Sequence, residues 1–137
     1  MYSMEIIKKF FTTGTLVSAL IFISVRESPA NTALENIQKY PGAQALCDEH
    51  VSSNTVHIAW KSFGTRDAVA TVAKFFEQSF GSKASAGEHD SLKIVHPANA
   101  DLIVTVYPKQ SAESFPHCDK KPEASTETVV LISQAIR

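Results

Sequence analysis

Both cysteines of the sequence have neighbours of the types that bind metal ions. Two aspartates and two histidines lie within three residues of Cys47 or Cys118: Asp48, His50, His117 and Asp119. A bond between the cysteines would bring these four side chains together. Two histidines with one carboxylate form a common ligand set for divalent transition metals. Because neighbouring sequence positions supply no coordination geometry, we expect a solvated polar border around a disulfide, with no cofactor, and keep the metal site as the alternative.

The two cysteines are the only ones in the chain. In an oxidising compartment an even pair is expected to be bonded, and closing so long a loop adds roughly 4 kcal/mol of stability. Neither Cys47 nor Cys118 belongs to a C-x-x-C pair, so the spacing gives no support for thiol redox catalysis. The sequence therefore predicts a structural disulfide.

Motifs of nucleophilic catalysis are absent from the sequence. It contains no G-x-S-x-G elbow, S-x-x-K, H-E-x-x-H or glycine-rich phosphate loop. A dispersed site is the remaining route to an enzyme, for example His89 with Glu88 and Asp90 in a charged loop. We expect a non-enzymatic protein and keep a small hydrolase with a His/carboxylate site as an alternative.

Composition and charge narrow the class of protein. The chain has 137 residues, 44% of them hydrophobic and 20% charged, which is typical of one folded domain. A net charge of -1 provides no basic field for binding phosphates, so we expect no nucleic-acid partner.

The first thirty residues have the order of a secretory signal peptide. Lys8 and Lys9 precede an apolar run over residues 15–25, and Ser-Pro-Ala follows at 28–30. An apolar run of about 11 residues is short of the roughly 20 that span a bilayer. We predict a cleaved signal over residues 1–30 and a periplasmic or secreted domain over 31–137. The alternative is a form tethered to the membrane by an uncleaved segment.

One strong helix and several strands are expected in that domain. Apolar residues at helical spacing between 67 and 80, followed by Gly81, predict the main helix, and a capping box at Thr32 predicts a short helix ending near Tyr40. Residues 81–91 and 109–126 have the composition of loops. Alternation or apolar runs predict strands at four places: 55–63, 92–96, 101–107 and 127–132.

The arrangement of the strands is less determined. Residues 43–51 are either a strand, paired as a hairpin with 55–63, or a turn of helix. Within 55–63 we expect Ile58 and Trp60 to face the core and His57 to face outward. The predicted fold class is α+β: a single-layer antiparallel sheet of four to five strands packed by one main helix, plus a short N-terminal helix.

Aromatic residues offer a candidate binding surface. Phe75 is one helical step off the apolar stripe, and an exposed Phe75 beside Phe63 or Tyr107 would form a contact patch; otherwise all three belong to the core. A second candidate is the loop held by Cys118, with Phe115 and His117 near its tip, which would suit an inhibitor of a secreted hydrolase.

Two short motifs resemble small exported bacterial proteins of unknown function. The first is the turn Tyr40-Pro41-Gly42-Ala43, and the second is a helix that starts at Asp67 and bears an aromatic pair, Phe75-Phe76. The resemblance covers about residues 40–80, and where those proteins often have Gly-Trp after the helix this chain has Gly81-Ser82. It implies a fold and an envelope location but no activity. We therefore expect an exported binding or accessory protein with a protein partner in the cell envelope.

Overall fold

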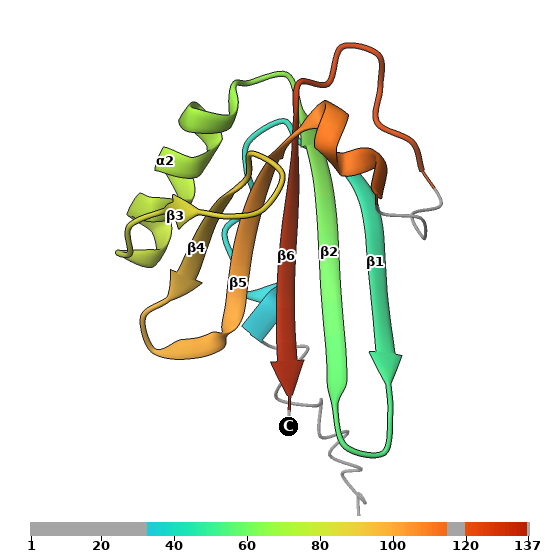
Figure 1. Ribbon diagram of the computed structural model, residues 1–137, viewed down its shortest axis with the longest axis vertical. Helices are drawn as coiled ribbons and strands as arrows, with labels where there is room; N and C mark the ends of the chain where they lie inside the picture. The colour runs from blue at the N-terminus through green and yellow to red at the C-terminus, as the bar shows by residue number, and fades with distance from the viewer. Residues whose placement is uncertain (1–32, 115–119, 137) are drawn as a thin grey trace, which may run out of the picture.

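The computed structural model describes residues 33–114 and 120–136 (Figure 1). The predicted signal peptide lies outside the described residues, and so do Phe115, Pro116, His117, Cys118 and Asp119. None of the described helices combines the length and the apolar content needed to cross a membrane.

One six-stranded antiparallel sheet forms the body of the protein, in the order β1-β2-β6-β5-β4-β3. The predicted α+β class and antiparallel sheet are confirmed, but the number of strands is higher than the four to five expected. The additional strand is β3, whose two residues lie in the segment predicted as a loop and pair with β4. The strands are β1 (Gln44–Ser52), β2 (His57–Thr65), β3 (Ser85–Ala86), β4 (Leu92–His96), β5 (Asn99–Pro108) and β6 (Thr128–Ile136).

The last strand lies at the centre of the sheet. β6 pairs with β2 on one side and with β5 on the other, so it joins the N-terminal hairpin β1–β2 to the strands that follow the helix (Figure 1). A strand that is buried on both faces has a continuous apolar sequence rather than an alternating one. In agreement, the neighbouring residues Val129 and Val130 of β6 are both buried. The hairpin between residues 43–51 and β2 is confirmed, which settles residues 44–52 as a strand.

The main helix, α2 (Val69–Phe80), packs on β4 and β5 with the apolar stripe that the sequence predicted. Gly81 ends it with φ 67°, and the Gly81 N–H donates to the Glu77 carbonyl at 2.8 Å. The helix begins two residues later than predicted because Ala68 is extended. Of the predicted N-terminal helix, residues 33–35 are helical and residues 38–40 are not. A short 3-10 helix, η2 (Lys109–Ser114), contacts β5 and β6.

The hydrophobic core lies between the helices and one face of the sheet. On β2 this face carries Ala59 and Phe63, whereas Ile58 is 41% exposed. The expectation that Ile58 and Trp60 face the core was wrong, because β2 pairs with β6 in a register that puts Phe63 beside Val130 of the core. The face opposite α2, over which no α-helix of the described residues lies, is called the helix-free face below.

Candidate functional site

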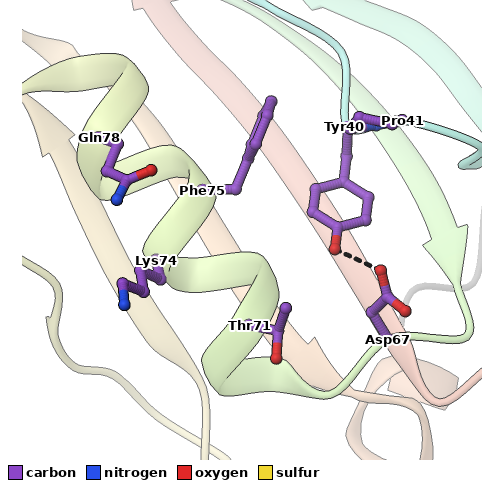
Figure 2. A pocket seen from close by; sticks show the side chains of 7 residues that line it. All are labelled: Tyr40, Pro41, Asp67, Thr71, Lys74, Phe75 and Gln78. Atoms are coloured by element: carbon purple, nitrogen blue, oxygen red, sulfur yellow. Dashed lines mark hydrogen bonds between the residues drawn. The ribbon is translucent and has the colours of Figure 1, made fainter.

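A shallow open pocket of about 280 Å³ lies between residues 40–41 and one side of α2 (Figure 2). Two of its walls come from segments that the sequence singled out, the Tyr-Pro turn and the start of the helix. Polar side chains of α2, spaced about one helical turn apart, form the third wall of the pocket. The lining residues are Tyr40, Pro41, Asp67, Thr71, Lys74, Phe75 and Gln78.

Tyr40 connects the N-terminal segment to the helix. Its hydroxyl donates to the Asp67 carboxylate, and its ring meets Phe75 edge-on with centroids 5.1 Å apart. The chain then turns sharply, because the Ala43 N–H donates to the Tyr40 carbonyl at 3.3 Å and Gly42 adopts φ 71°. A left-handed φ is easy only for glycine, which explains the Tyr-Pro-Gly-Ala sequence at this point. The turn fixes where the Tyr40 phenol points.

Asp67 is fixed through its backbone as well as its side chain. Its N–H donates to the Thr65 hydroxyl at 3.3 Å, and its carbonyl accepts from the Thr128 hydroxyl at 2.6 Å. Thr128 is fully buried at the start of β6. Three separate stretches of chain, residue 40, the end of β2 and the start of β6, therefore hold this one carboxylate in place. Figure 2 shows the resulting contact between the phenol and the carboxylate.

The electrostatics of the pair keep the phenol protonated. The hydrogen bond to Asp67, followed by burial and by repulsion from the carboxylate, raises the pKa of Tyr40 to about 12. At neutral pH Tyr40 is therefore a neutral donor to Asp67, with lone pairs that can still accept a hydrogen bond. The group is unsuited to act as a general base under those conditions.

The helix side of the pocket adds polar groups and an aromatic surface. Thr71, Lys74 and Gln78 are exposed, and Phe75 is half-buried between them and Tyr40 (Figure 2). The set offers an ammonium, an amide, a hydroxyl and a carboxylate around an aromatic ring. This is a combination for non-covalent binding of a small polar molecule with one apolar side.

The predicted metal ligands are only partly placed. Asp48 and His50 are exposed on β1, and the Asp48 carboxylate lies 3.6 Å from the ammonium of Lys61. Their expected partners His117 and Asp119 lie outside the described residues. Within the described part of the chain, no three His, Cys, Asp or Glu side chains gather closely enough to hold a metal ion. The metal site and the polar border both stay predictions.

The predicted disulfide also involves a residue outside the described part of the chain. Cys47 is buried in β1, with 8% of its surface exposed. Its expected partner, Cys118, is outside the described residues, and so the pairing stays a prediction.

The three aromatic residues predicted as a contact patch lie in different places. Phe63 belongs to the core, Phe75 lines the pocket, and Tyr107 is half-buried on the helix-free face, where it pairs with Val129. Burial raises the pKa of Tyr107. Phe75 alone of the three therefore lines the pocket.

The polar side of the pocket was not predicted from the sequence. Thr71, Lys74 and Gln78 are spaced three and four residues apart, which places them on one side of a helix next to the apolar stripe. That spacing is visible in the sequence, but nothing in it indicates that residues 40–41 pack beside this side. Comparison of the chain with family models, with curated proteins and with solved structures found no match.

Proposed function

We propose that this protein is an exported, non-enzymatic binding or accessory domain of the cell envelope, which binds a small polar ligand in the pocket beside Tyr40. The order of charge, apolar run and small residues at the N-terminus supports export. The observation that carries the binding role is the Tyr40–Asp67 hydrogen bond at the mouth of an accessible pocket.

That hydrogen bond matters because it fixes polar groups in advance of binding. A flexible carboxylate on the surface loses side-chain entropy when a ligand orders it, whereas the Asp67 carboxylate is already held by its own backbone contacts and by Tyr40. Preorganised polar groups beside an aromatic surface are characteristic of specific small-ligand sites.

The lining favours a ligand with several hydroxyl or amide groups on a compact ring or chain. Asp67 accepts hydrogen bonds, Lys74 donates them, and the Gln78 amide does both. Phe75 provides an apolar surface against which C–H groups can pack. Sugars and short peptide segments combine such hydrogen-bonding groups with apolar C–H groups. Both are abundant chemical types in a cell envelope.

Export also motivates the disulfide as part of the proposal. Cys47 and Cys118 would be bonded in an oxidising compartment. In support, Cys47 is buried and the described part of the chain contains no free thiol. Intact mass of the exported protein, with and without reduction, tests the pairing and the position of the cleavage together.

The binding role is tested with isotope-labelled protein and a panel of neutral oligosaccharides, amino acids and short peptides. We expect one class of probe to shift the backbone resonances of Thr71, Lys74 and Phe75. Lys74→Ala should weaken that binding about ten- to a hundredfold, because a hydrogen bond to a charged group contributes roughly 1.5–3 kcal/mol.

Lys83→Ala is the matched control, since Lys83 is exposed just beyond the helix and is not among the lining residues. It should leave binding unchanged. Probes that bind with equal strength to both variants, or that shift only resonances away from α2, would contradict a ligand site at this pocket.

A further inference from the structure

The helix-free face of the sheet carries large apolar residues in three neighbouring rows, with polar residues between them. One row crosses five strands and contains Trp60 on β2, with Ile103 on β5 and Val95 on β4. The next row contains Leu131 on β6, and the row on the other side contains Val51 and Ile58. An antiparallel sheet with one face in water normally carries polar residues on that face. This pattern is typical of a covered surface.

Among the residues that the structure describes, cover over the helix-free face is found at one end. Figure 1 shows η2 in front of the sheet near the start of β6. Thr126 lies against Gly64, where an added Cβ would come within 3.2 Å of the Thr126 methyl group. Val129 at this end is buried. Toward the other end of the strands, Ile58 is 41% exposed and Val51 is 55% exposed. Exposed apolar residues of these rows therefore continue beyond the part that the described residues cover.

Residues of opposite charge lie near the two lateral ends of the helix-free face, and a two-fold rotation would bring those of one copy beside those of a second copy. Glu49 lies on β1 in the row of Trp60, and Lys93 lies on β4 in the adjacent row. A two-fold axis parallel to β6 would place β1 of one copy over β4 of the other. Glu49 of each copy then faces the Lys93 side of its partner, and this contact occurs twice.

The same rotation also matches side-chain sizes. It places β2 over β5, so that Trp60 of one copy lies over Ile103 of the other. The central position of the row is Ser133 on β6, a small residue that would face its own copy and leave space for the two tryptophans. Two twisted sheets pack face to face in this aligned manner in β-sandwiches.

We propose that a second copy of this chain covers the helix-free face, forming a two-fold dimer in which Trp60 is central and each Glu49 pairs with Lys93 of the other copy. The proposal does not depend on the ligand pocket, because Tyr40 and α2 lie on the other side of the sheet. A dimer of this kind leaves both pockets accessible.

Sedimentation of the exported protein over a range of concentrations tests the dimer. We expect dimers in the unmodified protein, and Glu49→Lys or Lys93→Glu should each raise the dissociation constant at least about tenfold through like-charge repulsion. The double variant, with both charges exchanged, should restore dimerisation. Restoration excludes misfolding as the reason for the single-variant loss.

Asp48→Lys is the matched control. It makes the same charge change on the same strand, but Asp48 pairs with Lys61 and so belongs to the other face. It should leave the dimer intact. A chain that stays monomeric at all concentrations would overturn the proposal and leave the face to a different occupant, and dimers that ignore both single charge reversals would overturn this arrangement.

Discussion

The two faces of the sheet are covered in different ways. On the core face, α2 and Leu34 close over the strands, and Ile94, Val104 and Val130 have no exposed surface. On the helix-free face, local cover ends near Gly64, and apolar residues beyond it stay exposed. Within the described residues, α2 is the one helix long enough to close a face of the sheet, and large apolar residues occur on both faces. The pocket lies on the closed side, and the surface proposed for self-association lies on the other.

The largest expected effect is a difference in the free energy of unfolding between a truncation on the core face and one on the helix-free face. Phe76→Ala should lower the free energy of unfolding by about 3–5 kcal/mol, because it leaves a cavity under α2. Trp60→Ala should cost less, about 1–2 kcal/mol, in the monomer, where the side chain is half-buried on the helix-free face. Denaturant unfolding of both variants in a Glu49→Lys background removes the contribution of the dimer. Equal losses would show that the helix-free face is as closed as the core.

A smaller effect is expected at the pocket. Tyr40→Phe keeps the ring against Phe75 but removes the hydrogen bond to Asp67, and should cost about 0.5–1 kcal/mol. The raised pKa of Tyr40 means that this stabilisation is fully present below the unfolded pKa of 10.0 and is lost as the pH rises through about 12.

Tyrosinate absorbance during an alkaline titration measures this directly. The ionisation near pH 12 should disappear in Tyr40→Phe and persist in Tyr107→Phe. If the last ionisation belongs to Tyr107 instead, the Asp67 contact is not formed in solution.

The smallest effect concerns the link between residues 33–35 and β2. The Glu35 carboxylate lies 2.9 Å from the Lys61 ammonium, whose hydrogen bond lowers the pKa of Glu35 below 4.5. This stabilisation is present above that value and is lost as the pH falls through the lowered pKa. Glu35→Gln should therefore flatten the acid dependence of stability slightly, whereas Glu127→Gln, at another exposed site, should not. A steeper acid limb in Glu35→Gln would contradict the ion pair.

The sequence was sufficient for elements whose pattern is local. The stripe from Val72 to Phe80 and the glycine after it specify α2 without reference to the rest of the chain. The orientation of β2 could not be obtained this way, because apolar residues occur on both of its faces and only pairing with β6 decides which face meets the helix.

The pocket depends on contacts that are distant in sequence. Tyr40 and Asp67 are 27 residues apart, and Thr128 meets Asp67 across 61 residues. No local pattern records such contacts, although both Tyr40 and Asp67 belong to the motifs that resembled small exported proteins. The two-residue strand β3 was missed for a related reason, since its pairing with β4 is what makes it a strand.

The contrast between the faces is tested most directly by the emission of Trp60, the single tryptophan of the chain. As the protein concentration rises, we predict a shift of the emission to shorter wavelength and weaker quenching by acrylamide. Both changes should be absent in Glu49→Lys and should return in the charge-exchanged double variant. Emission that stays constant and equally quenched over the whole concentration range would contradict burial of this face by a second copy.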